Sequence, residues 1–277
     1  MAEGLGIVAG RGVLPRLIAE SCARHGRPYR VVVLDGVTLD WLAGHPAFAA
    51  SFERPGRLFA ALRAAGCGAV TFAGGLVRPR LRPLRFDVTM WRLAPRLLRA
   101  VRAGDDATLR AVAQAFEAAG FRVEAAQALL PELPAVAGVH GRAEPSARDR
   151  ADAARAAAIV AALGAVDVGQ AAVVAQGICL GLESIQGTDA LLDFVARTGA
   201  GFRPDPAGAR GVLFKAPKPG QDRRLDLPAI GPETMRAAAA AGLAGVAVEA
   251  GGVMILDHAA TVAAADAAGL FLWARAP

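Results

Sequence analysis

The segment LGIVAGRGVLP, residues 5–15, decides the fold of the N-terminal half of the chain. Its short apolar run leads into a glycine loop, Gly10-Arg11-Gly12, and Pro15 then opens an amphipathic stretch. A continuous apolar run of this kind is typical of a buried strand, and proline is favoured in the first turn of a helix. The segment therefore predicts a strand, a glycine loop and a helix, in that order.

The same alternation of short apolar runs and amphipathic stretches continues to residue 125. We predict further strands at Arg30–Leu34, Ala69–Ala73 and Phe121–Ala125, and helices at Arg57–Ala65, Met90–Ala103 and Asp105–Ala119. Uninterrupted apolar strands that alternate with helices indicate a mainly parallel sheet covered by helices on both faces. We therefore expect an α/β fold whose N-terminal domain, residues 1–135, is Rossmann-like.

A second α/β domain is expected after a break in composition. Residues 136–145 lie among prolines and glycines, lack a helical period, and are interpreted as a linker. Ser146 then opens a helix that runs to Leu163, with Asp149 placed as the acid of a capping box. In this C-terminal domain, residues 146–277, we predict strands at 171–175, 178–182, 211–215, 246–249 and 253–256, and helices at 188–197, 232–241 and 259–268.

The composition excludes several classes of protein. Hydrophobic residues make up 54% and charged residues 20% of the 277 positions, which rules out an intrinsically disordered chain. The three cysteines, Cys22, Cys67 and Cys179, form no CxxC pair, and the N-terminus lacks the cations of a signal peptide. No uninterrupted apolar stretch reaches the ~20 residues of a membrane span. We therefore expect a cytoplasmic protein that can still contact a membrane surface peripherally, and the apolar excess is compatible with a homodimer.

The positive charge of the chain does not indicate a nucleic-acid partner. The formal net charge is +6, and 29 of the 31 cationic residues are arginine. Aromatic residues are only 5%, whereas proteins that bind single strands set aromatic platforms beside their cations. We expect no nucleic acid to bind.

The strongest chemical motif is FKAPKPGQDRRLDLPAIG, residues 214–231, which contains both lysines of the chain, Lys215 and Lys218. An ammonium group is a compact charge on a flexible stem, which suits a phosphoryl group whose geometry changes during reaction. Three prolines stiffen the segment, and Asp226 lies near its end. Two ammonium groups and a carboxylate on a rigid loop suit metal-assisted phosphoryl chemistry. The alternative is a proline-rich surface loop.

Several polar and glycine residues outside this motif are candidates for ligand binding. Glycines after the first strand let backbone amides approach an anion, although Pro15 breaks the G-x-G-x-x-G pattern and a plain tight turn is the alternative. Amide and hydroxyl side chains in the C-terminal half offer donors and acceptors. The predicted substrate-binding residues are Gly10, Gly12, Gln170, Gln176, Thr188, Lys215, Lys218 and Gln221.

Arginines and carboxylates form two further groups. Four arginines between Arg78 and Arg85 suit phosphates of a ligand or a membrane surface, or belong to a solvated loop. The histidines show no ligand spacing, so any metal is expected to be Mg²⁺ or Mn²⁺ on oxygen ligands. The carboxylates predicted as ligands are Asp226, Glu183 and Asp189; Asp105 and Asp106 are further candidates, or they stabilise a helix N-terminus.

Taken in order, these motifs resemble those of one family. They are GLGIVAGRGVLP at 4–15, GDDATLR at 104–110, GQAAVV at 169–174, GTDALL at 187–192, KAPKPGQDRRLDLPAIG at 215–231 and AGLAGVAVEAG at 241–251. The family is that of the UDP-2,3-diacylglucosamine pyrophosphatases of lipid A biosynthesis of the LpxI type, which are unrelated to calcineurin-like phosphoesterases. The likeness runs from Leu5 to about Phe271.

The resemblance implies a two-domain hydrolase. It would cleave the pyrophosphate of a lipid-linked UDP-sugar, UDP-2,3-diacylglucosamine, to UMP and 2,3-diacylglucosamine 1-phosphate (lipid X). The resemblance also implies Mg²⁺ dependence, attack by water on the phosphorus at the sugar side, and a substrate between the domains. The family's essential aspartate falls on Asp226. Arg11 and Gly75 depart from the pattern, which often has glycine and asparagine there.

Two other functions compete with this one on the sequence alone. A non-catalytic regulator that binds a nucleotide sugar or a lipid would use the same polar residues and leave its ligand unaltered. A nicotinamide-dependent oxidoreductase would use the N-terminal glycine loop, but Pro15 argues against it.

Overall fold

The computed structural model describes residues 3–75 and 81–276. The chain divides into two compact units. The first unit consists of Met1–Pro131 and a short segment from the C-terminal half, Asp222–Asp226, and the second unit consists of Glu132–Gln221 and Leu227–Pro277. The α/β fold class with two domains is confirmed.

The first unit contains a five-stranded sheet whose order is β3-β2-β1-β4-β5 and whose strands are all parallel. The strands are β1 (Gly4–Ala9), β2 (Tyr29–Leu34), β3 (Ala47–Ala50), β4 (Cys67–Ala73) and β5 (Arg122–Val123). The apolar runs predicted β1, β2 and β4 correctly. The edge strand β3 was not predicted, because its residues are half-buried or exposed and give no continuous apolar signal.

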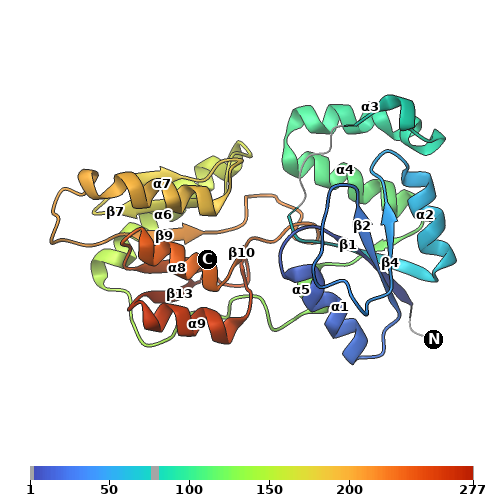
Figure 1. The fold of residues 1–277 in the computed structure, drawn as a ribbon. Coiled ribbons are helices and arrows are strands. Elements are labelled where there is room, and N and C mark those ends of the chain that lie inside the picture. Colours follow the sequence, from blue (N-terminus) through green and yellow to red (C-terminus); the bar gives the residue numbers. More distant parts are fainter. Residues whose placement is uncertain (1–2, 76–80, 277) are drawn as a thin grey trace. The chain divides into compact units, whose positions relative to one another are not determined.

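Helices cover both faces of this sheet (Figure 1). They are α1 (Leu14–Arg24), α2 (Pro55–Ala64), α3 (Val88–Ala103), α4 (Asp105–Ala118) and α5 (Ala126–Leu129). Helices α2 and α4 bury Phe59 and Phe116 against Val8 and Val70, whereas α1 and α5 lie on the other face. Helix α3 packs on α4 and α2 and forms a further layer outside them.

The second unit contains a mixed six-stranded sheet of order β6-β13-β11-β9-β7-β8. Its strands are β6 (Gly138–His140), β7 (Ala171–Ala175), β8 (Ile178–Leu182), β9 (Val212–Lys215), β11 (Gly245–Glu249) and β13 (Phe271–Arg275). The central strands β9, β11 and β13 are parallel, and β6, β7 and β8 pair antiparallel with their neighbours. A separate pair, β10 (Ala229–Ile230) and β12 (Met254–Ile255), is parallel.

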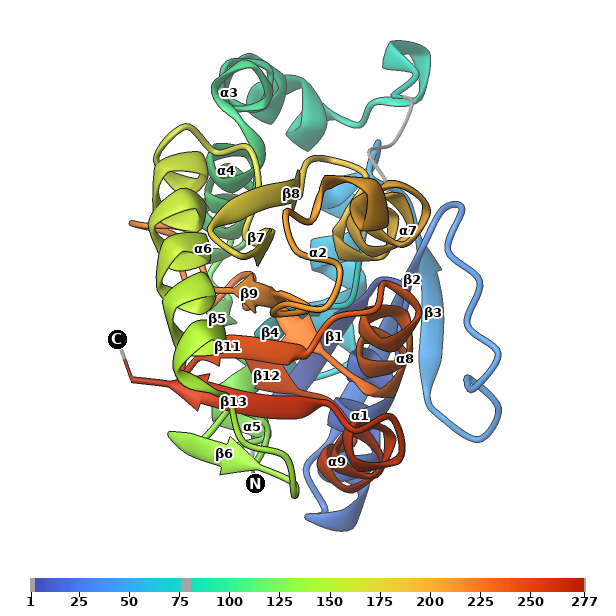
Figure 2. The same ribbon diagram turned by 90° about the vertical axis from the view of Figure 1, so that its left-hand side faces the viewer.

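One long helix covers one face of this sheet and three shorter helices cover the other, as Figure 2 shows. The helices are α6 (Ala147–Ala165), α7 (Thr188–Thr198), α8 (Pro232–Ala240) and α9 (His258–Ala267). The predicted capping box at the start of α6 is present, since Ser146 accepts from the Asp149 backbone and the Asp149 carboxylate accepts from the Ser146 backbone.

The expected linker at residues 136–145 is not a plain linker. It contains β6, which pairs antiparallel with β13 so that Val139 lies opposite Trp273. A three-residue strand bounded by glycine has no periodicity to detect, and its partner lies more than a hundred residues away along the chain. None of the helices in the described part of the chain is long and apolar enough to cross a bilayer.

Candidate functional site

Lys215, at the carboxyl end of β9, lies at the centre of a buried polar chain in the second unit. Its ammonium donates to the hydroxyl of Thr188 over 2.8 Å and to the backbone oxygen of Ala229 over 3.1 Å. The Thr188 hydroxyl in turn donates to the carboxylate of Glu183. Lys215 and Glu183 are only 7% and 6% exposed. We call Lys215, Thr188 and Glu183 the buried polar chain. It keeps an ammonium and a carboxylate together away from water, as buried charges require.

Gln170 lies next to this chain, just before β7. Its backbone oxygen accepts from Ala216, the residue after Lys215, over 3.0 Å. Its side-chain oxygen Oε1 is buried and has no hydrogen-bond partner among the described residues. An unsatisfied buried acceptor costs about 1–3 kcal/mol, so this position favours a donor supplied from outside the chain. The hydrogen bond between Ala216 and Gln170 makes Gln170 a neighbour of Lys215, as the prediction that both bind one ligand requires.

The second lysine, Lys218, already has a partner that the sequence analysis missed. Its ammonium lies 2.5 Å from the carboxylate of Asp167 in the turn after α6. The Lys218 backbone donates to Oε1 of Gln221 over 3.0 Å, and the Gln221 backbone donates back over 3.2 Å. Gly164 lets α6 approach this turn, because a Cβ there would lie 2.6 Å from Pro219. Lys218 and Gln221 thus shape the segment between β9 and β10, residues 216–228, which we call the lysine loop.

Gln176 has a clear structural role. Its carboxamide nitrogen donates to the backbone oxygens of Asp205 and Ala209 over 2.7 and 3.0 Å, and its oxygen accepts from the Asp205 backbone over 2.9 Å. Its own backbone, in a left-handed conformation, donates to the buried carboxylate of Asp152. Gln176 therefore fastens the 205–209 loop to the turn between β7 and β8. Its contact with a ligand stays a prediction.

The N-terminal glycine loop packs against the loop that follows β4. Arg11 and Gly75 exchange backbone hydrogen bonds of 2.8 and 3.0 Å. A Cβ on Gly10 would lie 2.6 Å from the oxygens of Gly74 and Gly75, so this glycine is needed for the contact between the two loops. A Cβ on Gly12 would meet open space, although its φ of +96° favours glycine. The strand order reverses between β1 and β4, which is where ligands bind in open α/β sheets.

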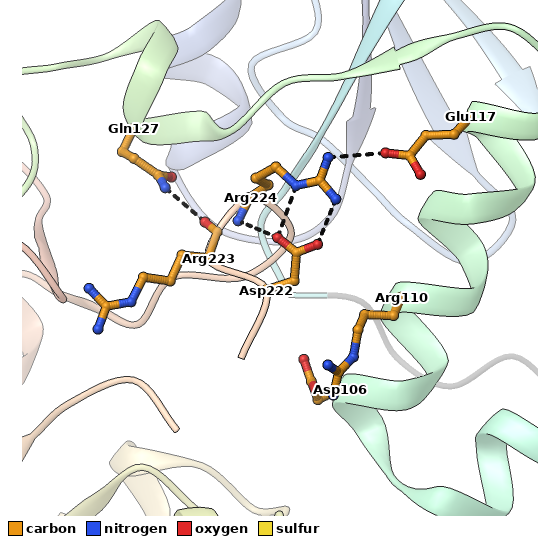
Figure 3. A network of polar contacts seen from close by, with 7 residues as sticks. All are labelled: Asp106, Arg110, Glu117, Gln127, Asp222, Arg223 and Arg224. Atoms are coloured by element: carbon orange, nitrogen blue, oxygen red, sulfur yellow. Dashed lines mark hydrogen bonds and ion pairs between the residues drawn. The ribbon is translucent and has the colours of Figure 1, made fainter. Parts of the chain in front are cut away.

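The segment Asp222–Asp226 belongs to the first unit, although its place in the sequence predicts that it is part of the C-terminal domain. Figure 3 shows its polar contacts. The Arg224 side chain donates to the Asp222 carboxylate over 2.8 and 3.0 Å and to Glu117 of α4 over 3.0 Å. These hydrogen bonds from Arg224 lower the pKa of Asp222 below its usual value. Gln127 of α5 donates to the backbone oxygen of Arg223 over 2.8 Å.

Leu225 provides the apolar part of this attachment. It is 7% exposed and belongs to the same hydrophobic cluster as Phe116 and Val123. Burial of this leucine explains why the tip of the lysine loop groups with the first unit rather than with the second. Asp226, the predicted catalytic residue, follows directly and is exposed. The structure thus holds Asp226 on a firmly attached segment.

The predicted metal ligands are distributed over both units. Glu183 is part of the buried polar chain, Asp189 is exposed in the first turn of α7, and Asp226 is in the first unit. Among the described residues, no three His, Cys, Asp or Glu side chains are grouped as a metal site. The ligand set stays a prediction. Asp105 and Asp106 occupy the first turn of α4, where their charge favours the helix.

Part of the arginine-rich loop can be described. Arg78 and Arg80 lie outside the described residues. The backbone of Arg82 donates to Glu53 over 2.7 Å, and the Arg85 guanidinium lies 3.6 Å from the same carboxylate. Glu53 is 6% exposed and was not singled out from the sequence, because its partners follow about thirty residues later.

Comparison with known proteins covers nearly the whole chain. The family model of the LpxI N-terminal domain matches residues 4–133, and that of the LpxI C-terminal domain matches residues 136–273. The chain belongs to the LpxI family. It is 40% identical over 268 residues to "UDP-2,3-diacylglucosamine pyrophosphatase LpxI" of Caulobacter vibrioides, covering 97% of this chain and 96% of that protein. The resemblance drawn from the motifs is therefore confirmed.

A likeness to a solved structure is much weaker. N5-carboxyaminoimidazole synthase from Aspergillus clavatus, in complex with ADP and an aminoimidazole ribonucleotide, is 16% identical with a TM-score of 0.24. The match covers 69% of this chain and 43% of that one, and a score this low supports no inference.

In this LpxI family member, the residues that sequence reasoning missed are Asp167, Asp152, Glu53 and Glu117. Each is a carboxylate whose partner is distant in sequence, so no local pattern reveals it.

Proposed function

We propose that this LpxI family member hydrolyses the pyrophosphate of UDP-2,3-diacylglucosamine to UMP and 2,3-diacylglucosamine 1-phosphate in lipid A biosynthesis. The observation that carries the proposal is the 40% identity, over almost the full length of both chains, to a protein named for this activity. The buried polar chain and the attached loop that ends at Asp226 supply suitable chemistry.

The second unit supplies the groups that would neutralise and orient the diphosphate. Lys215 and Lys218 carry positive charge, and the NH2 of the Gln170 carboxamide can donate to phosphate or sugar oxygens. The Thr188 hydroxyl donates to Glu183 and accepts from Lys215, so its part would be to hold the Lys215 ammonium in place. The unsatisfied Oε1 of Gln170 would accept from a ligand hydroxyl or amide. In the first unit, Gly12 and the neighbouring backbone amides would approach an anionic group.

Asp226 is the proposed catalytic residue. Mg²⁺ is often held by one or two carboxylates together with substrate phosphates, so a single exposed aspartate fits this ion without a preformed cluster. When bound, the ion would neutralise charge on the phosphoryl oxygens. Asp226 would hold this ion or orient the attacking water. The water oxygen would bond to the phosphorus at the sugar side and lose a proton to solvent. The bond from that phosphorus to the bridging oxygen would break, and UMP would leave with the bridging oxygen.

The direct test measures UMP after incubation of the full chain with UDP-2,3-diacylglucosamine and Mg²⁺. We expect Asp226→Ala to lower kcat by orders of magnitude while leaving substrate binding largely intact. The matched control is Asp40→Ala, which removes another exposed carboxylate of the first unit and should leave the rate unchanged. Absence of UMP from the wild-type reaction would refute the proposed function, and a normal rate for Asp226→Ala would refute the catalytic role.

The alternative functions give different results in the same preparation. A regulator would bind the substrate and return it unaltered. An oxidoreductase would change the fluorescence of NADH on binding. The cytoplasm as location, contact with the inner membrane and a homodimer stay part of the proposal, each testable by fractionation of cells or by sedimentation of the purified chain.

A further inference from the structure

Helix α3 exposes an apolar stripe beside a stripe of arginines. The apolar stripe consists of Trp91, Ala94, Leu98 and Val101, and the basic stripe consists of Arg92, Arg96, Arg99 and Arg102. Spacings of three and four residues place the members of each stripe along one line of the helix. Trp91, Leu98 and Val101 are 58%, 60% and 43% exposed. We call these eight residues the α3 surface.

This apolar stripe is not the face by which α3 packs. Met90 is 3% exposed and Leu93, Leu97 and Ala100 are half-buried; they form the face that packs on α4 and α2, and Trp91 and Leu98 lie beside this face rather than in it. Figure 1 shows α3 on the side of α4 away from the sheet of the first unit. The exposed tryptophan and leucine are therefore additional to the core of the unit.

The charge on α3 and on the segment before it is almost entirely positive, and the acids that follow, Asp105 and Asp106, belong to the first turn of α4. Residues 81–103 contain six arginines and a single acid, Asp87. That carboxylate accepts from the backbone of Met90 over 2.7 Å and of Gly56 over 2.8 Å, so it caps α3 and is not available to the basic stripe. Leu84, just before α3, is fully exposed and extends the apolar surface.

We propose that the α3 surface docks on an anionic lipid bilayer, with the axis of α3 in the plane of the interface. An amphipathic helix with aromatic and aliphatic residues beside arginines has the composition of interfacial helices. Arginine stems can cover apolar lipid while their guanidinium groups bind headgroup phosphates. The inference rests on α3 alone and does not depend on the proposed reaction.

Charge argues against a second copy of the chain as the occupant. In a two-fold contact the same surface faces itself, so the four arginines of one copy would meet those of the other. The α3 sequence holds no acid to pair with them, and like charges across a contact oppose association. An anionic bilayer complements both stripes at once.

The first experiment measures sedimentation of the full chain with vesicles, without substrate. We expect binding to phosphatidylcholine mixed with phosphatidylglycerol, little binding to phosphatidylcholine alone, and weaker binding at high salt. The double variant R92Q/R99Q should lower the partition coefficient roughly 30-fold, about fivefold for each arginine. The matched control R16Q/R24Q removes two exposed arginines from α1 of the same unit and should bind as the wild type does.

The second experiment tests the apolar stripe. L98S/V101S should weaken binding to the anionic vesicles, whereas I185S, which removes an exposed aliphatic side chain of the second unit, should not. Trp91 is the one exposed tryptophan of the three, since Trp41 and Trp273 are partly buried. Brominated lipids should therefore quench wild-type fluorescence, and W91F should lose most of this quenching.

Three results would overturn the proposal. One is equal binding to neutral and anionic vesicles, and another is equal weakening by R16Q/R24Q and R92Q/R99Q. The third is absence of vesicle binding in a wild-type dimer that L98S/V101S converts to a monomer, which would make a second copy the occupant. A failed UMP assay has no bearing on any of these readouts, so the two proposals fail separately.

Discussion

Leu225→Ala tests whether the tip of the lysine loop is held by burial in the first unit. Leu225 is 7% exposed and lies in the hydrophobic cluster that includes Phe59, Phe116 and Val123. The substitution leaves the hydrogen bonds of Asp222 and Arg224 available and removes only the apolar attachment. It therefore separates the contribution of packing from that of the polar network.

The expected cost follows from the burial. Replacing a buried leucine by alanine costs about 2–5 kcal/mol, and a loop residue, whose surroundings can collapse, belongs near the lower end, about 2–3 kcal/mol. Chemical denaturation followed by circular dichroism would report this as a lower midpoint with an unchanged slope. Because Asp226 is the next residue, we also expect a lower kcat for UMP formation.

The matched control is Leu182→Ala, which removes a leucine that is 47% exposed on β8 and should cost well under 1 kcal/mol. Equal unfolding free energies for Leu225→Ala and the wild type would refute the attachment by Leu225. Loss of stability with an unchanged kcat would show instead that Asp226 keeps its position without this leucine.

Three further predictions concern other parts of the chain. Thr188→Val removes the hydroxyl that links the two charges of the buried polar chain, so we expect a loss of about 1–3 kcal/mol in urea unfolding, largely restored in Thr188→Ser. Hydrogen bonds from Arg27 lower the pKa of Glu124 below its ordinary 4.5, so ionised Glu124 stabilises the fold above that pH and the contribution is lost as the pH falls through the lowered pKa. The stability difference between wild type and Glu124→Gln should therefore shrink on acidification, and a constant difference would contradict it. Gly10→Ala should lower the melting temperature, since its Cβ would lie 2.6 Å from two backbone oxygens, whereas an unchanged value would show that the loops separate easily.

Elements with a continuous apolar run were predictable from the sequence. The bounds of β7 and β8 were predicted correctly, because Gln170 and Gln176 flank the first apolar run and Gly177 and Glu183 flank the second. The start of α6 was equally clear from the serine and aspartate of its capping box. Two strands of the six-stranded sheet were not predicted. β6 has only three residues and exists through its pairing with β13, whereas β13, Phe271–Arg275, has an apolar run that we did not assign to a strand.

In the candidate site, likewise, local motifs identified several residues but not the contacts between them. The two lysines, Thr188, Glu183 and Asp226 were singled out because unusual residues stand together in the motifs. The sequence could not show that Glu183 and Lys215 share one hydroxyl, or that Lys218 pairs with Asp167. These contacts join residues up to 51 positions apart, so they exist only once the strands and helices have packed.

The amino-acid sequence by itself determined the α/β class, the order of most strands and helices, the family and the aspartate on which the chemistry is proposed to depend. These follow from local hydrophobic patterns and from motifs, which short stretches of chain encode completely. Only the tertiary structure decided that Asp222–Asp226 groups with the first unit and that an ammonium and a carboxylate are buried together. The physical reason is that burial of Leu225 and pairing of charges depend on which distant side chains exclude water, and no local pattern contains that information.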